Sequence, residues 1–166
     1  MDIVVISDTH GRTDRLSEIM RRTNCGILLF LGDGLRDLQV VRDDVTVRAV
    51  RGNCDFYGAD IPETRLEVFG PYRVFMTHGH RYSVKLGLGA AIGAAARANA
   101  DVLLYGHTHV PEVTHLHAGD QVGGVVLQKP LTVLCPGSLG APKDGRPTFA
   151  TLTLRNEGIL PSIGYY

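Results

Sequence analysis

The sequence is poor in several features that would point to particular classes of protein. It has no tryptophan and only three cysteines, Cys25, Cys54 and Cys135, whose odd number and irregular spacing favour free thiols over a disulfide framework. Its formal net charge is zero, which argues against nucleic acid or an anionic membrane as a partner. No apolar run approaches the roughly 20 residues that span a bilayer. The start, MDIVVISDTH, lacks the basic residues of a secretory signal, so we expect a cytoplasmic protein.

The composition is that of a globular protein of modest size. The chain has 166 residues, of which 44% are hydrophobic and 20% are charged. We find no repeat, linker or low-complexity segment. The sequence therefore predicts one domain that covers residues 1–166.

The first half of the chain alternates between strand and helix signals. Short apolar runs rich in β-branched residues at 3–7, 27–33 and 45–50 predict strands buried on both faces. Helical spacing of apolar residues at 12–23, with Thr13 as N-cap, and at 35–41 places a helix after each of the first two strands. This rhythm predicts a parallel sheet.

The second half is richer in strands. Runs at 64–70 and 72–79 predict a hairpin that turns at Gly70-Pro71, followed by a helix at 84–99 and a strand at 101–106. Further strand signals cover 110–117, 122–127, 131–135 and 149–154. Gly89 and Gly93 predict close packing of the helix on a sheet, with a subunit contact as the alternative. The whole pattern predicts two packed sheets with helices outside.

Five of the predicted strands end in groups that can bind a metal ion. The groups, in strand order, are Asp8 and His10, then Asp33, then Asn53 with Cys54 and Asp55, then His78 and His80, then His107 and His109. Each alone is readily explained as a turn or surface residue. Because ligands of open α/β sheets bind beyond the carboxyl ends of the strands, we expect the five groups to converge.

The residue types narrow the chemistry of this site. Carboxylate, amide oxygen and imidazole without an obligatory thiolate suit Mn, Fe, Zn or Co better than Ca or Mg. Seven ligands are too many for one tetrahedral site, and they suit two metals if one carboxylate bridges them. Glycines beside the ligands would let the backbone turn sharply and approach closely.

These motifs together resemble those of a known superfamily. Asp8-Thr-His10, Gly32-Asp33, Gly52-Asn53, His78-Gly-His80 and Gly106-His107-Thr-His109 occur in the order and strand positions found in the calcineurin-like metallophosphoesterases. Pro136-Gly137-Ser138 adds a resemblance to the small phosphodiesterases of the YfcE type. The resemblance implies an α/β fold, a four-layer α/β/β/α sandwich of two mixed sheets flanked by helices.

The resemblance also implies roles for the ligands. Asp8, His10 and His109 would hold one metal, Asn53, His78 and His107 the other, and Asp33 would bridge them. We expect two divalent transition metals, with Mn as the first choice and Fe, Zn, Co or Ni as alternatives. Two divalent cations carry four positive charges, which the two carboxylates reduce to two and a bridging hydroxide nucleophile to one. A phosphodiester monoanion matches that charge, so we predict a dinuclear phosphodiesterase with a small phosphodiester substrate.

Three positions near the ligands have open roles. Many relatives carry a histidine at the position of Cys54, where it protonates the leaving oxygen, and a thiol is a poor replacement. Asp55 either orients a ligand histidine or makes a turn. His80 contacts phosphate, orients His78 or is structural; we group it with Asp33 and Asn53 as catalytic.

Two other functions are alternatives to a phosphodiesterase. A phosphomonoesterase of the same fold is one alternative, and a non-catalytic interaction scaffold resembling the retromer subunit is another. Retention of all seven ligand positions favours an enzyme over a non-catalytic scaffold. Neutral charge and the lack of an added DNA-clasping domain argue against a nuclease. A homodimer or homotetramer is left open.

Overall fold

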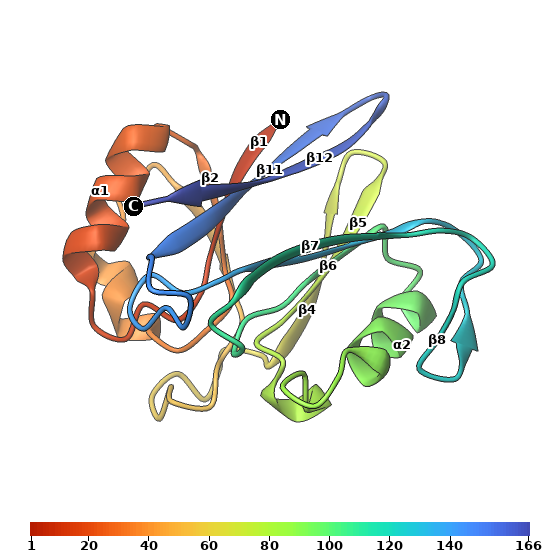
Figure 1. Cartoon of the computed structure of the whole chain (residues 1–166). Helices are drawn as coiled ribbons and strands as arrows, with labels where there is room; N and C mark the ends of the chain where they lie inside the picture. Colours follow the sequence, from red (N-terminus) through yellow and green to blue (C-terminus); the bar gives the residue numbers. More distant parts are fainter.

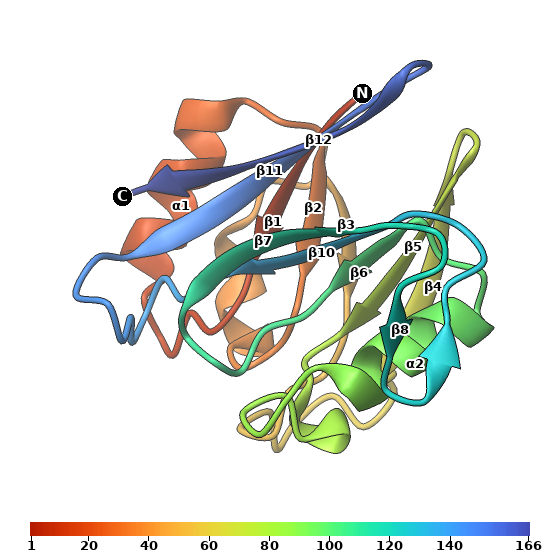
Figure 2. The same cartoon turned by 45° about the vertical axis from the view of Figure 1, so that its right-hand side comes forward.

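The computed structural model describes residues 1–166 and contains two mixed sheets of five strands each. Figures 1 and 2 show the two sheets packed face to face, with one helix outside each. The first sheet, in spatial order, contains β12 (Gly158–Tyr165), β11 (Thr148–Arg155), β1 (Asp2–Ile6), β2 (Ile27–Phe30) and β3 (Thr46–Ala49). The second contains β4 (Thr64–Phe69), β5 (Tyr72–Thr77), β6 (Val102–Leu104), β10 (Leu131–Pro136) and β7 (Pro111–Leu116).

The remaining elements cover the sheets. Helix α1 (Thr13–Thr23) and the 3-10 helix η1 (Leu35–Val40) lie outside the first sheet. Helix α2 (Gly89–Arg97) covers the second sheet, next to the hairpin of β8 (Gln121–Val122) and β9 (Val125–Val126), and η2 (His80–Tyr82) follows β5. No helix has the length and apolar character needed to cross a bilayer.

Apolar side chains fill the three spaces between these four layers. Ile3 and Val5 of β1 face Val74 and Leu104 of the second sheet in the central layer. Alternate residues of β1 point outward, so that Val4 and Ile6 pack against Leu16, Ile19 and Met20 of α1. The i, i+3, i+4 spacing on α1 therefore buries one stripe of the helix, as predicted. The four-layer α/β/β/α sandwich is confirmed.

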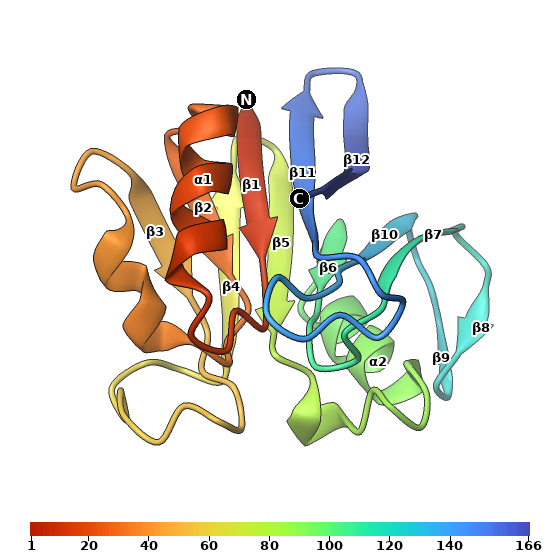
Figure 3. The same ribbon diagram turned by 60° about the vertical axis from the view of Figure 1, so that its left-hand side comes forward.

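Three strands of each sheet are parallel to one another. β1, β2 and β3 pair in parallel, as do β5, β6 and β10, whereas the pairs β1–β11, β11–β12, β4–β5 and β7–β10 are antiparallel. The carboxyl ends of β1, β2, β5 and β6 consequently meet at one edge of the molecule, at the bottom of Figure 3. This edge carries the residues that the sequence singled out.

Several local predictions were wrong. The helix predicted at 84–99 begins only at Gly89, since Ser83 has a positive φ of 51° and Gly87 one of 154°. The strand predicted at 122–127 is the β8–β9 hairpin, because Gly123 and Gly124 adopt φ angles of 58° and 76° that reverse the chain.

Two further details differ at the chain's first helix and last strand. Thr13 does not cap α1, whose N-cap is Arg12 without a side-chain hydrogen bond. β12 was missed because Pro161 interrupts its pattern, and an edge strand tolerates proline.

The close approach expected at Gly89 involves the hairpin turn. A Cβ on Gly89 would lie 3.0 Å from the Cα atom of Gly123, and a Cβ on Gly123 would overlap the carbonyl group of Gly89. The glycine therefore serves an intramolecular contact between α2 and the β8–β9 turn.

Candidate metal centre

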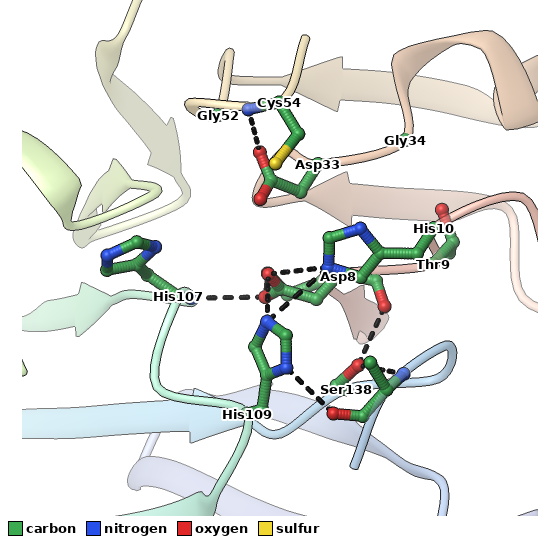
Figure 4. Close-up of polar contacts among 12 residues, drawn as sticks. Asp8, Thr9, His10, Asp33, Gly34, Gly52, Cys54, His107, His109 and Ser138 are labelled. Carbon is green, nitrogen blue, oxygen red and sulfur yellow. Dashed lines mark hydrogen bonds and ion pairs between the residues drawn. The ribbon is translucent and has the colours of Figure 1, made fainter. Parts of the chain in front are cut away.

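The structure brings all seven predicted ligands together in two adjacent clusters. They lie in the loops that follow β1, β2, β3, β5 and β6, at the edge where these strands end. Figure 4 shows five of them, Asp8, His10, Asp33, His107 and His109. Asp8 is fully buried, and the other ligand residues come from loops that follow strands of both sheets. The rule that ligands gather beyond the carboxyl ends of parallel strands accounts for this convergence.

The first cluster is a triangle of potential ligand atoms. Asp8 Oδ1 lies 3.0 Å from His109 Nε2 and 3.6 Å from His10 Nε2, and the two imidazole nitrogens are 3.4 Å apart. Ligands held about 2.1 Å from one ion are separated by about 3.0–3.4 Å in octahedral or tetrahedral geometry. Two of the three distances fall in this range and the third, 3.6 Å, is slightly longer, so the spacing is close to that of ligands around one ion.

The second cluster is centred on His78, which is fully buried. Its Nε2 atom lies 3.1 Å from Asn53 Oδ1, 3.1 Å from His107 Nδ1 and 3.4 Å from Asp33 Oδ2. The spacing again matches that of atoms around a single ion.

Asp33 lies between the two clusters. Its carboxylate lies close to His78 and His107 on one side and to His10 and Cys54 on the other. Oδ1 accepts a 2.7 Å hydrogen bond from the backbone N–H of Cys54, and this bond fixes the orientation of the carboxylate. Asp33 is thus the one carboxylate placed to serve both clusters.

The backbone at these positions is held in an unusual conformation. Eight non-glycine residues have positive φ, and five of them are predicted ligands: Asp8, His10, Asp33, His107 and His109. Such left-handed backbone costs free energy in residues with a Cβ and concentrates at functional sites. The surrounding fold therefore holds strain at the positions where it presents these side chains.

Two glycines allow the strand ends to approach one another. A Cβ on Gly52 would overlap Asp33 Oδ1, and a Cβ on Gly106 would overlap the hydroxyl oxygen of Ser7 next to Asp8. Both glycines were predicted to permit close approach of the backbone.

The hydrogen bonds of two histidines determine which ring nitrogen faces each cluster as an electron-pair donor. His78 Nδ1 donates to the carbonyl of Leu31 at 2.7 Å, and His109 Nδ1 donates to that of Ala141 at the same distance. The Nε2 atoms of both rings therefore present lone pairs to the clusters. Because Asp8 Oδ1 is also buried without a hydrogen-bond partner, protons or metal ions must lie between these atoms. The donor set fits divalent transition metals.

The same contacts shift the ionisation of the carboxylates. Burial opposes ionisation of Asp33, but His78 and the N–H of Cys54 outweigh it and lower the pKa of Asp33 to about 2. Burial also opposes ionisation of Asp8, yet the nearby imidazoles of His10 and His109 outweigh it and bring its pKa well below the ordinary value. Both carboxylates are anionic at neutral pH, as metal ligands must be.

We expect divalent metal to bind more weakly as the pH falls from about 7.5 to about 5.5. Asp8 raises the pKa of His10; burial disfavours protonation of His78, but Asp33 and Asp8 outweigh it and raise its pKa also. In the metal-free protein these imidazoles keep their protons above the usual pKa of about 6.5, so metal must displace them. Calorimetric titration with Mn²⁺ in two buffers of different ionisation enthalpy measures affinity and released protons. An affinity independent of pH would contradict the expectation.

Asp55 fixes the loops that carry two ligands. Its carboxylate accepts hydrogen bonds of 2.8–2.9 Å from the backbone N–H groups of Asp33, Gly34, Leu35 and Gly52. No contact with a histidine accompanies them. Of the two roles considered for Asp55, the geometry corresponds to organising the turn, and through it the position of Asp33.

Replacing Asp55 with alanine should lower the free energy of unfolding by about 3 kcal/mol, because four N–H groups lose one charged acceptor. Asp55→Asn should cost about half as much. Urea denaturation of the metal-free proteins measures both. Asp44→Ala is the control, since that carboxylate is 71% exposed in a surface pair and should contribute under about 1 kcal/mol. Equal effects of Asp55→Ala and Asp44→Ala would refute the organising role.

Two further residues that support Asp8 and its loop were not assigned such a role from sequence. Ser138 is buried, donates to the carbonyl of Asp8 at 2.7 Å and accepts from the N–H of Ala141 at 2.8 Å (Figure 4). Asp37 accepts from the hydroxyl of Thr9 at 2.5 Å. Pro136-Gly137-Ser138 gave a signal for the first, whereas Asp37 reads as an ordinary acidic residue in a helix's first turn.

Cys54 and His80 lie beside the clusters. Partial desolvation and the nearby Asp33 carboxylate raise the pKa of the Cys54 thiol to about 11, so it stays protonated at neutral pH. His80 belongs to neither cluster, although its ring centroid is 5.4 Å from that of His78. Burial and the proximity of His78 lower the pKa of His80, which favours a neutral ring.

Residues 1–157 match the sequence pattern of the calcineurin-like phosphoesterase superfamily domain. The chain belongs to this superfamily. Use of divalent metal and hydrolysis of phosphoesters are the properties predicted from the ligand motifs, and the family assignment confirms both in that general form.

Named relatives agree with the assignment. The chain is 31% identical to the probable metallophosphoesterase YsnB of Bacillus subtilis, over 95% of this chain and 86% of the relative. It is 28% identical to the phosphodiesterase YfcE of Escherichia coli K12, over 89% of this chain and 84% of the relative. These similarities confirm the predicted resemblance to metallophosphoesterases and to YfcE.

Solved structures share the fold. A predicted phosphoesterase from Streptococcus pneumoniae superposes with a TM-score of 0.77 at 24% identity, covering 99% of this chain and 88% of the other. Vps29 of Chaetomium thermophilum superposes with a TM-score of 0.72 at 16% identity, covering 100% and 95%. Both likenesses concern the fold alone.

Proposed function

We propose that the chain is a dinuclear metal-dependent phosphodiesterase that hydrolyses small phosphodiesters. The observation that carries the proposal is the pair of ligand triangles with Asp33 between them. Asp8, His10 and His109 hold one ion, and Asn53, His78 and His107 hold the other. Carboxylate, amide and imidazole donors without a thiolate support Mn²⁺ first, with Fe, Zn, Co or Ni as alternatives.

When bound, two divalent ions would supply a hydroxide nucleophile near neutral pH and positive charge for the phosphoryl oxygens. The chain's own residues set the net charge of the site. Only Asp8 and Asp33 among the ligands are anionic, so the site retains positive charge that suits a phosphodiester monoanion. This charge balance supports a diester over a monoester dianion.

Side chains of the protein have separate roles in positioning the reacting groups and in protonating the leaving group. Asp33 and Asn53 position the reacting groups, and neutral His80 lies near enough to the second cluster to contact a phosphoryl oxygen. On the leaving-group side stands the Cys54 thiol, a weak acid that donates a proton poorly. We therefore infer that the leaving group of the substrate must depart as a stable anion.

The likeness to Vps29 is one of fold and does not favour a scaffold role for this chain. All seven ligand positions are occupied by residues that can bind metal, and their atoms are spaced to do so. A scaffold needs neither property, so the enzyme remains the better-supported function.

A matched pair of substrates tests the proposal against a phosphomonoesterase. Metal-stripped protein is supplied with each candidate metal and given bis(p-nitrophenyl) phosphate or p-nitrophenyl phosphate, which release the same leaving group. We expect hydrolysis only with metal, and a higher kcat/KM for the diester. Preference for the monoester would assign the site to phosphomonoesters.

Residues 1–166 act, in this proposal, as one domain whose site is built from both sheets. The three free cysteines support a reducing, cytoplasmic location. A homodimer or homotetramer remains a prediction.

A further inference from the structure

Two aromatic side chains stand exposed beside the proposed metal site. Phe56 is 87% exposed and Tyr57 is 65% exposed, three and four residues after Asn53. Their loop is anchored on both sides, by the four hydrogen bonds of Asp55 and by Ile61, which packs against the core. A fixed loop that presents two large rings to solvent is characteristic of a binding surface.

The two rings border a pocket that opens from the metal site. This pocket has a volume of about 280 Å³, and His10, Asp33 and Cys54 line it together with Phe56 and Tyr57. A group attached to a phosphoryl centre at the ligand clusters would enter it directly. The volume is near the lower end of small-molecule sites, so it suits one substituent of a substrate.

Arg36 holds Tyr57 in place. Its guanidinium lies 3.6 Å from the centroid of the Tyr57 ring, in a cation–π contact. Both residues also line a neighbouring pocket of about 380 Å³ on the far side, so the stacked pair forms a wall between the two spaces. The wall carries the positive charge of Arg36, which attracts a phosphodiester anion.

We propose that Phe56 and Tyr57, backed by Arg36, form an aromatic platform that binds a flat ring carried by one ester group of the substrate. The proposal rests on the proposed phosphodiesterase function and specifies its substrate class, phosphodiesters with an aryl substituent. Stacking on aromatic side chains tolerates different rings, because each presents a π face. The metal site binds the phosphoryl group and the platform selects its substituent.

Binding of two unreactive ligands to the Mn-loaded protein tests the platform. Phenylphosphonate and methylphosphonate share the phosphonate group and differ by the ring. By calorimetry we expect phenylphosphonate to bind about ten-fold more tightly to the parent. Phe56→Ala and Tyr57→Ala should each remove most of this preference and leave methylphosphonate binding unchanged.

Two control variants separate stacking from general effects. Tyr57→Phe retains the ring and should retain the preference. Leu160→Ala removes another apolar side chain, 55% exposed on the remote β12 strand, and should have no effect. Equal binding of the two phosphonates to the parent, failure of both to bind, or a preference that survives Phe56→Ala and Tyr57→Ala would overturn the platform alone. Failure of the same Mn-loaded protein to hydrolyse bis(p-nitrophenyl) phosphate would overturn the proposed function.

Discussion

Replacing Asp33 with alanine is expected to abolish most metal binding and to lower kcat/KM for bis(p-nitrophenyl) phosphate by at least about 1,000-fold. The carboxylate lies between the two clusters, so its loss would weaken both proposed ion sites and remove one of the two negative charges that would hold the ions near each other. Elemental analysis after growth in excess Mn²⁺ should give close to two metals per chain for the parent and well below one for the variant.

A matched carboxylate elsewhere provides the control for Asp33. Asp44→Ala removes the same charge from an exposed position and should leave metal content and activity unchanged. Circular dichroism must show that Asp33→Ala is folded, since Asp33 Oδ1 also accepts from the N–H of Cys54. Two metals per chain in a folded Asp33→Ala variant would refute the bridging role.

Hydrolysis is expected to depend steeply on the acidity of the leaving group. The Cys54 thiol, with its pKa raised to about 11, gives the leaving oxygen little assistance, so nitrophenyl diesters should react far faster than alkyl or nucleotide diesters. A Cys54→His variant should narrow this gap, because an imidazole with a pKa of about 6.5 is an effective general acid, worth about 10²–10⁴-fold. Asp55 already accepts four backbone hydrogen bonds and cannot readily orient the new ring, so we expect about 10²-fold.

A series of diesters with graded leaving-group pKa, measured on three proteins, tests this expectation. Parent and Cys54→Ala should show the same steep dependence, and Cys54→His a flatter one. If the parent shows a flat dependence while chemistry limits the rate, another residue donates the proton. His80 would then be the first candidate, and the interpretation of Cys54 would be wrong.

The sequence was most informative where local patterns and a general topological rule coincide. The apolar runs of β1 and β2 are buried on both faces, which only a central strand of a covered sheet requires. Once those strands are parallel, their carboxyl ends must meet, so Asp8 and Asp33 could be placed together without knowing any distance. The histidines that follow β5 and β6 join them for the same reason.

Features that depend on contacts distant in sequence could not be predicted. The four hydrogen bonds of Asp55 join the loops after β2 and β3, and a lone aspartate in a turn does not reveal them. The Arg36–Tyr57 contact likewise joins two segments without a motif.

One wrong prediction could have been avoided. The positive φ angles of Gly123 and Gly124 reverse the chain within the predicted strand at 122–127, and paired glycines are a turn signal that could have been used.

Stepwise addition of Mn²⁺ to metal-stripped protein tests the central claim most directly. Hydrolysis of bis(p-nitrophenyl) phosphate is followed at each addition, with bound metal measured in parallel. The dinuclear account predicts no activity without metal and a rate that levels off when two ions are bound per chain. Full activity in the stripped protein, or a plateau at one ion per chain, would contradict it.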